Sequence, residues 1–188
     1  MGKKINLPLF FSPTALQRLF HYDGERAVGK VAEKFGTFFG ISSLATVGIE
    51  EIGNDYSCPK IFQLYIHKDK GLNDSMIEKC KDYNFDAIAL TVDTIVGGNR
   101  ERDLRTGFTS PPQFNFGSFF SFAMHPKWTI DYLLREKFEL PQLKDYVKEG
   151  TIINVSISDY FNTMLDQNMN WKKIEEINKK WVKHLCLK

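Results

Sequence analysis

The stretch IFQLYIHKDKGLNDSMIEKCKDYNFDAIALTV (61–92) holds two apolar runs separated by a polar segment. The runs 61–66 and 87–92 have the length and the Ile, Leu and aromatic content of buried strands. The segment between them predicts a helix over 73–84, with Asn73 or Asp74 as its N-cap. A strand, a helix and a second strand in this order predict two parallel strands joined by a crossover helix.

The same pattern precedes this stretch. Runs 7–11 and 37–41 predict two earlier strands, and 48–52 predicts a short helical turn. Between the two strands we expect a helix within 23–36, capped by Asp23 and ended by Gly36. The runs are apolar throughout, as is typical of parallel strands that are covered on both faces.

After the fourth strand the pattern lapses over 109–169, where we expect one long inserted loop with small helices near 127–136 and 141–148. Regularity returns with a predicted helix over 170–182, capped by Asn170. Its apolar face is expected to contain Trp171, Ile174, Ile177 and Val182. HLCLK (184–188) then begins a fifth strand.

Repeated strand–helix units predict an α/β protein, and no dinucleotide fingerprint follows the first strand. A βα-barrel is therefore favoured over a Rossmann domain. A complete (β/α)8 barrel takes about 250 residues, whereas this chain has 188. We predict a partial TIM barrel, about its first half, in which 1–188 form a single incomplete domain.

Composition indicates a soluble globular protein, with 43% hydrophobic and 26% charged residues. The net charge of +2 gives no sign of nucleic acid as a partner. Three cysteines without a C-x-x-C pair favour a reduced, cytoplasmic chain and no metal site. The first apolar run is too short for a signal peptide or a membrane span.

Polar side chains stand where the predicted strands end, which is where βα-barrels place their working residues. Strand by strand these are Ser12, Pro13, Thr14, Ala15, Ser42, Gln63, Tyr65, Thr91, Asp93 and Lys188. Together they could surround a polar heterocycle with several donors and acceptors. Taken singly, a Gln or Thr could be a satisfied core group, Tyr65 a packing residue and Asp93 a loop cap.

Several segments resemble the FMN-dependent α-hydroxy-acid dehydrogenase family, which includes flavin-linked L-lactate dehydrogenases and glycolate oxidases. They are SPTALQRLFHYDGERAV (12–28), GISSLAT (40–46), FQLYIHKD (62–69), ALTVDT (89–94), NRERDLRTGF (99–108) and SDYF (158–161). The resemblance extends from about Leu7 to Lys188 and implies oxidation of an L-2-hydroxy acid, with L-lactate to pyruvate as the leading reaction. It also implies an electron acceptor (quinone, cytochrome or oxygen) and a homo-oligomer.

The resemblance assigns roles to individual residues. FMN is expected to contact Pro13, Thr14, Ala15, Ser42, Gln63, Thr91 and Lys188. Tyr65 and Arg100 are expected to bind substrate, and Tyr65 and Asp93 to act in catalysis, where Asp93 orients a histidine. A lysine such as Lys188 suits the negative charge that builds up on a reduced flavin.

The sequence departs from the family pattern at Gly48, Ile95 and Asn99. The family's histidine motif, of the SNHG type, does not occur, and none of His21, His67, His125 and His184 has its context. We therefore expect a truncated chain that is inactive alone and binds FMN weakly. The alternative is a non-catalytic remnant or assembly fragment that pairs with a complementary half.

The segment FNFGSFFSFAMHPKW (114–128) is rich in phenylalanine. These rings could pack under the barrel mouth or at a subunit contact. Alternatively, 114–122 could form a loop that dips into the surface of a membrane, as a peripheral contact on its inner face.

Overall fold

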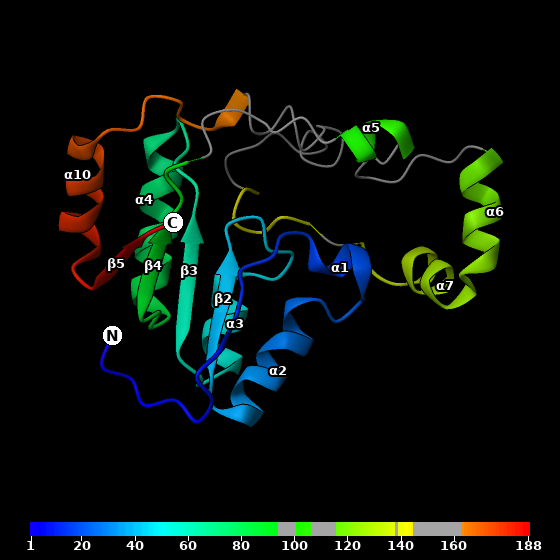
Figure 1. The fold of residues 1–188 in the computed structure, drawn as a ribbon, viewed down its shortest axis with the longest axis horizontal. Coiled ribbons are helices and arrows are strands. Elements are labelled where there is room, and N and C mark those ends of the chain that lie inside the picture. The colour runs from blue at the N-terminus through cyan, green and yellow to red at the C-terminus, as the bar shows by residue number, and fades with distance from the viewer. Residues whose placement is uncertain (94–100, 107–115, 138, 145–162) are drawn as a thin grey trace.

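Five parallel strands form one sheet in the order β1-β2-β3-β4-β5 in the computed structural model (Figure 1). The structure describes residues 1–93, 101–106, 116–137, 139–144 and 163–188. The strands are β1 (Phe10–Phe11), β2 (Phe38–Ser42), β3 (Lys60–Leu64), β4 (Ala87–Leu90) and β5 (His184–Leu187). Each strand pairs in parallel with the next in sequence. The predicted α/β architecture is thereby confirmed.

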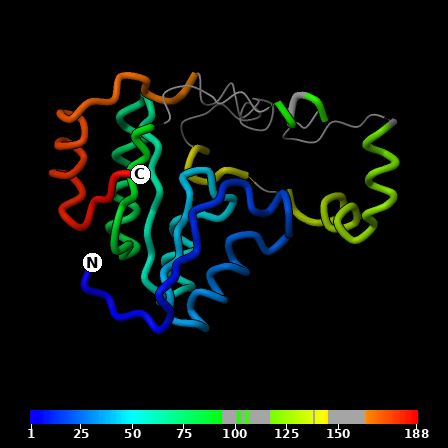
Figure 2. Tube along the Cα trace, in the orientation of Figure 1, coloured from blue at the N-terminus to red at the C-terminus, as the bar shows by residue number. Residues whose placement is uncertain are grey.

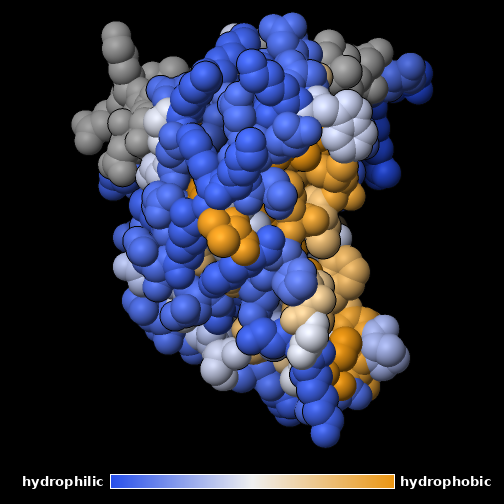
Figure 3. All heavy atoms as spheres, turned by 90° about the vertical axis from the view of Figure 1, so that its left-hand side faces the viewer, coloured by the Kyte–Doolittle hydropathy of each residue, from blue (hydrophilic) through white to orange (hydrophobic). Residues whose placement is uncertain are grey.

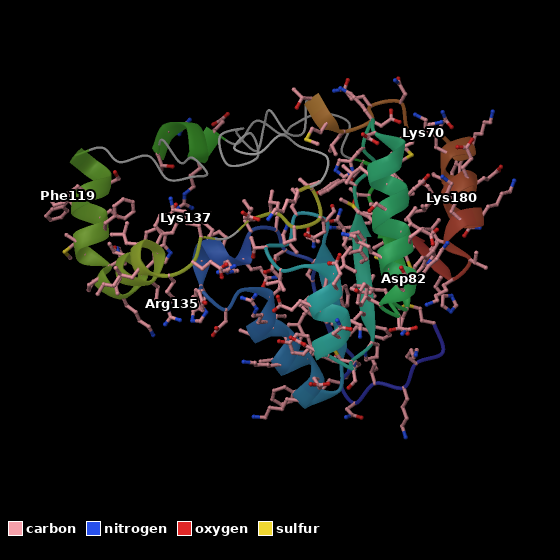
Figure 4. The ribbon with its side chains drawn as sticks, turned by 180° about the vertical axis from the view of Figure 1, so that it is seen from behind. Lys70, Asp82, Phe119, Arg135, Lys137 and Lys180 are labelled. Atoms are coloured by element: carbon pink, nitrogen blue, oxygen red, sulfur yellow. The ribbon has the colours of Figure 1, made fainter. Side chains whose placement is uncertain are left out.

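Helices cover one face of this sheet, as the views from the front and from behind show (Figures 1 and 4). The helices are α1 (Gln17–Phe20), α2 (Glu25–Phe35), α3 (Ile49–Asp55), α4 (Lys70–Asp82), α5 (Glu101–Thr106), α6 (Phe116–Met124), α7 (Pro126–Leu134) and α10 (Trp171–Trp181). None of the helices in the described ranges has the length and hydropathy that a membrane crossing requires.

The core lies between the sheet and the helices α2, α3, α4 and α10. Phe39, Phe62 and Ile88 of the strands are fully buried, as is Trp181 of α10. The rings of Phe62 and Phe85 meet edge to face, with centroids 6.1 Å apart. These buried side chains hold the helical layer on the sheet, and they leave the ends of the strands for other roles.

The two outer strands are not buried, which contradicts the expectation of a buried strand at 7–11. Phe10 is 57% exposed, and regular pairing begins only at this residue. β5 is likewise largely exposed. The reason is their place at the two edges of the described sheet, where each has a neighbour on one side only.

Two predicted helix caps and one predicted helix face need correction. Asp23 is not the cap of α2, because Gly24 occupies that position with a φ of 49°. The cap of α4 is Asp69, whose side chain accepts from Leu72 N, rather than Asn73 or Asp74. On α10, Trp171 and Val182 are exposed, and Ile177 and Trp181 form the buried face. Gly36 with a φ of 60° and Asn170 end and begin their helices as predicted.

The N-terminal residues run across the end of the sheet where the strands begin (Figure 2). Asn6 N donates to Gly36 O at 2.8 Å, and Lys3 pairs with Asp86 at 2.9 Å. The opposite edge, formed by the carboxyl ends of the strands, carries the polar residues singled out from sequence.

A buried carboxylate connects the two loops at that edge. Glu25 is fully buried and accepts from Thr46 N at 2.9 Å and from Thr46 Oγ1 at 2.6 Å. Thr46 Oγ1 in turn accepts from Arg18 N at 3.2 Å, and Leu16 N donates to Leu44 O. The loop after β1 and the loop after β2 are thus held together through Thr46.

His67 connects the end of β3 to the segment that follows the inserted region. Its ring Nδ1 lies 3.2 Å from Asn73 Oδ1, and its backbone forms an isolated antiparallel bridge with Leu165. Burial, only partly offset by the contact with Asn73, lowers the pKa of His67 from 6.5 to about 4. The folded chain therefore holds this ring neutral.

Acid is expected to weaken the fold through His67. The unfolded chain takes up a proton near pH 6.5, and the folded chain only near pH 4. The free energy of unfolding keeps this contribution in full above about pH 6.5 and loses it progressively as the pH falls from there to about 4, by roughly 3 kcal/mol in all. Urea unfolding of the His67→Gln variant should show a weaker pH dependence across this window. His21→Gln, at an exposed position, should retain the wild-type dependence; equal slopes for wild type and His67→Gln would contradict the assignment.

Thr46→Val should destabilise the chain by about 1–3 kcal/mol, because it leaves a buried carboxylate of Glu25 with one donor fewer. The matched control is Thr106→Val on the exposed surface of α5, for which we expect a change within about 0.5 kcal/mol. Unfolding midpoints from urea titration measure both. Equal midpoints for the two variants would show that the contact between Thr46 and Glu25 contributes nothing to the stability of the fold.

Candidate functional site

A chain of hydrogen bonds links the carboxyl ends of three neighbouring strands. Ser42 Oγ donates to Gln63 Oε1 at 3.1 Å, and Gln63 Nε2 donates to Thr91 Oγ1 at 2.7 Å. All three side chains are buried. The register explains their meeting, because Ser42 is paired with Gln63, and Thr91 directly follows β4 on the other side of β3.

This series of hydrogen bonds leaves some hydrogen-bond donors of its side chains unused. Among the described contacts, Gln63 uses one of its two N–H donors, and the Thr91 hydroxyl accepts without donating. A ligand at this edge would therefore meet an amide N–H and a hydroxyl hydrogen in fixed positions. Such donors suit a flat heterocycle that presents carbonyl oxygens and ring nitrogens, as the isoalloxazine ring of FMN does.

Lys188 lies next to Thr91 in the sheet. Lys188 N donates to Leu90 O at 2.8 Å, and Val92 N donates to Lys188 O at 3.0 Å. This parallel pattern places Lys188 directly opposite Thr91, so both side chains emerge on the same face of the sheet. The ammonium group is on an exposed residue and can place positive charge beside Thr91.

Tyr65 directly follows β3, and Asp93 lies three residues beyond the end of β4. Tyr65 is half-buried and Asp93 is exposed. Burial, reinforced by the negative charge of Asp93, raises the pKa of the Tyr65 phenol above its usual value. The phenol is therefore protonated at neutral pH and can donate a hydrogen bond to a bound anion or carbonyl.

The loop after β1 approaches this edge from the other side. A Cβ at Gly40 would lie 2.7 Å from Phe11 O and 2.8 Å from Pro13 Cδ, so only glycine permits this close approach of β1 to β2. Thr14 is exposed, and its Oγ1 accepts from Gln17 Nε2 at 2.7 Å. The Pro13-Thr14-Ala15 backbone is thus held beside the end of β2.

The described candidate residues thus come from one edge of the sheet, as their places in the sequence predicted. Pro13, Thr14 and Ala15 follow β1, Ser42 ends β2, and Gln63 and Tyr65 come from the end of β3. Thr91 and Asp93 follow β4, and Lys188 follows β5. Arg100, predicted to bind substrate, lies outside the described residues, so its position stays a prediction.

Two buried polar residues at this edge were missed from sequence. Within the described ranges, neither Ser43 Oγ nor Gln142 Oε1 has a hydrogen-bond partner. Gln142 lies over the loop after β2, and its Nε2 donates to Val47 O at 3.0 Å. The pair of serines in GISSLAT could have pointed to Ser43, whereas nothing in the local pattern marks Gln142.

Comparison with known proteins supports a flavin site. A family model described as FMN-dependent dehydrogenase matches residues 1–188. A putative L-lactate dehydrogenase of Mycobacterium tuberculosis is 30% identical over an alignment of 191 positions, which covers 100% of this chain and 44% of that protein. Glycolate oxidase 1 of Oryza sativa subsp. indica is 30% identical over 93% of this chain and 42% of its own length. An L-lactate dehydrogenase of Vibrio parahaemolyticus is 31% identical over 96% of this chain and 47% of its own length.

Solved structures share the fold. The monotopic membrane protein (S)-mandelate dehydrogenase superposes with a TM-score of 0.89 at 24% identity, covering 99% of this chain and 49% of that one. A putative lactate oxidase of Pediococcus acidilactici gives a TM-score of 0.72 at 25% identity, over 98% of this chain and 41% of its own.

The chain spans about half the length of the curated relatives it matches. Its five parallel strands correspond to a partial barrel, which confirms the predicted fold class. The family match over all 188 residues agrees with a polar strand-end edge that suits a flavin ring. The chain belongs to the FMN-dependent dehydrogenase family, whose cofactor is FMN and whose members oxidise α-hydroxy acids.

Proposed function

We propose that this chain supplies the flavin-ring and substrate-facing edge of an enzyme that oxidises an L-2-hydroxy acid, with L-lactate to pyruvate as the reaction. The observation that carries the proposal is the buried chain Ser42–Gln63–Thr91. Tyr65, Asp93 and Lys188 stand at the same edge.

The residues at the carboxyl ends of the strands would have different roles in the reaction. FMN, when bound, supplies the acceptor for the two electrons that leave the substrate. Gln63 and Thr91 would hold the ring through the donors that remain unused, with the backbone of Pro13-Thr14-Ala15 beside it. The Lys188 ammonium would stabilise negative charge on that ring. Together these contacts fix where the substrate carbon must approach.

Substrate binding would use the protonated phenol of Tyr65, which can donate to the substrate's oxygen. Arg100 would pair with the substrate carboxylate. Asp93 would orient a histidine that takes the proton from the substrate and would stabilise that histidine's charged form. This last role follows from the family resemblance and assigns no histidine of the chain as the base.

L-Lactate is the leading substrate because two of the matched relatives are named L-lactate dehydrogenases. Glycolate and (S)-mandelate are the alternatives, from the names of other matches. The electrons would pass on to a quinone, a cytochrome or oxygen. We further propose a cytoplasmic homo-oligomer in the complete enzyme, with peripheral contact to the inner face of a membrane through 114–122.

A second candidate function is that of an assembly fragment, and the uncovered face of the sheet favours it. Among the described residues, no helix lies on the face that carries Gln63. Seen from the α10 side, apolar residues gather along the right-hand margin of the view (Figure 3). Ile61 and Ala89 share this face and are only half-buried. Such a surface could pair with a complementary half-barrel.

The isolated 188-residue chain should show no oxidation of L-lactate with FMN and a dye acceptor, and weak or no FMN binding. The reason is that none of its histidines stands in an SNHG-type motif. In addition, His67 is buried against Asn73, and His184 lies at the opposite end of the sheet. Dye reduction and a flavin-fluorescence titration measure the two properties. Robust turnover or tight binding by this chain would contradict the expectation.

A chimera tests the function itself. This chain replaces the matching segment of the V. parahaemolyticus L-lactate dehydrogenase, and turnover is measured with L-lactate, glycolate and (S)-mandelate. Tyr65→Phe should lower kcat on the order of 10²-fold, because a donor to the reacting oxygen is lost. Tyr83→Phe, on the helical side at the end of α4, should leave kcat unchanged. A folded, FMN-loaded chimera that oxidises none of the three acids would overturn the proposal.

A further inference from the structure

Helices α6 and α7 form a hairpin whose apolar side chains face solvent. The hairpin lies at the far end of the molecule from α10 (Figure 1). Phe119 is 72% exposed and Leu134 is 81% exposed. The outer apolar surface is defined here as Phe119, Phe120, Met124, Ile130, Leu133 and Leu134. For Phe119 and Phe120 this exposure contradicts packing under the barrel mouth.

The hairpin does not need these side chains for its own packing. Its two helices join through a stack of three rings: Phe122 and Trp128 are 5.5 Å apart, and Trp128 and Tyr132 are 5.0 Å apart, both nearly parallel. Thr129 Oγ1 donates to Phe122 O at 2.7 Å and closes the turn between the helices. The outer apolar surface is therefore additional to a hairpin that is already packed.

The opposite side of the hairpin is attached to the body. Trp128 Nε1 donates to Leu19 O at 2.9 Å, and Arg18 Nη2 donates to Glu136 O at 3.0 Å. The guanidinium of Arg135 lies 4.2 Å from the centre of the Tyr22 ring. These contacts fix which side of the hairpin faces outward.

The hairpin is apolar on its outer side and carries charged residues on the side toward the body. α6 contains no charged residue. Figure 4 shows Phe119 on the outer side of α6, whereas Arg135 and Lys137 lie on the side toward the body. Over 125–139 the charged residues are Lys127, Asp131, Arg135, Glu136, Lys137 and Glu139, which balance to zero. An apolar outer side with charges behind it matches the profile of a bilayer interface, where rings enter the acyl boundary and charged groups remain at the headgroups.

We propose that the outer apolar surface of the α6–α7 hairpin inserts into the interface of a lipid bilayer, and that hydrophobic contact rather than attraction to anionic lipid drives the insertion. The proposal rests on the peripheral membrane contact proposed above. It extends that contact from 114–122 to Ile130, Leu133 and Leu134 of α7. The neutral sum of charges predicts that zwitterionic lipid suffices and that salt does not release the chain.

Flotation of the 188-residue chain tests this proposal without FMN or substrate, so its outcome is independent of the chimera's turnover. The chain is mixed with vesicles of pure phosphatidylcholine, or of phosphatidylcholine with phosphatidylglycerol, at low and high salt. We expect flotation in every case. The variants F119S/F120S and L133S/L134S should each reduce the vesicle-bound partition about tenfold or more. Trp171→Ser removes an aromatic side chain of equal exposure, 71%, from α10 and should float as wild type does.

Four outcomes would overturn the proposal. They are no flotation of the wild-type chain, flotation only with anionic vesicles at low salt, and unchanged flotation of both double variants. The fourth is wild-type self-association by light scattering that F119S/F120S abolishes without flotation, which would make this surface a contact between copies. Circular dichroism and urea unfolding confirm that each variant is folded. Because the substituted residues are exposed, we expect them to unfold at the wild-type midpoint.

Discussion

The parallel register of β2, β3 and β4 is the constraint on which the site depends. It sets Ser42 beside Gln63, and it brings Thr91 within 2.7 Å of the same amide. A slip of one residue in either pairing would turn these side chains to the helical face, where Phe39, Phe62 and Ile88 belong. The apolar core therefore fixes the polar edge, because burying the first set of side chains places the second.

The polar edge of the sheet could be predicted from sequence, since strand order and strand ends follow from short apolar runs. The positions of Ser42, Gln63, Thr91 and Lys188 at one edge needed only parallel pairing. Helix ends were less certain. Asp69 and Asn73 are both good capping residues; Asp69 caps α4, whereas the side chain of Asn73 bonds to the backbone of His67 in the loop before the helix. Local propensity does not contain that contact.

Residues joined by tertiary contacts alone could not be predicted. Gln142 reaches the loop after β2 from ninety-five positions away, and nothing in its neighbours marks it. Glu25 would pass for an ordinary surface residue of an amphipathic helix, yet it is fully buried against Thr46. Exposure was also misjudged for the strand predicted at 7–11: β1 has strand composition, but burial depends on neighbours that composition does not show.

One residue connects the loops at the strand-end edge with the α6–α7 hairpin. The backbone N–H of Arg18 donates to Thr46 Oγ1, the hydroxyl that bonds to buried Glu25. The side chain of Arg18 donates to Glu136 O after α7. The same guanidinium lies 5.2 Å from the Tyr22 ring that Arg135 also covers. The hairpin is therefore attached to the segment that carries Pro13, Thr14 and Ala15 toward the carboxyl ends of the strands, where we propose that FMN binds. A membrane that holds the hairpin would, through this short path, also fix the orientation of that edge relative to the lipid surface.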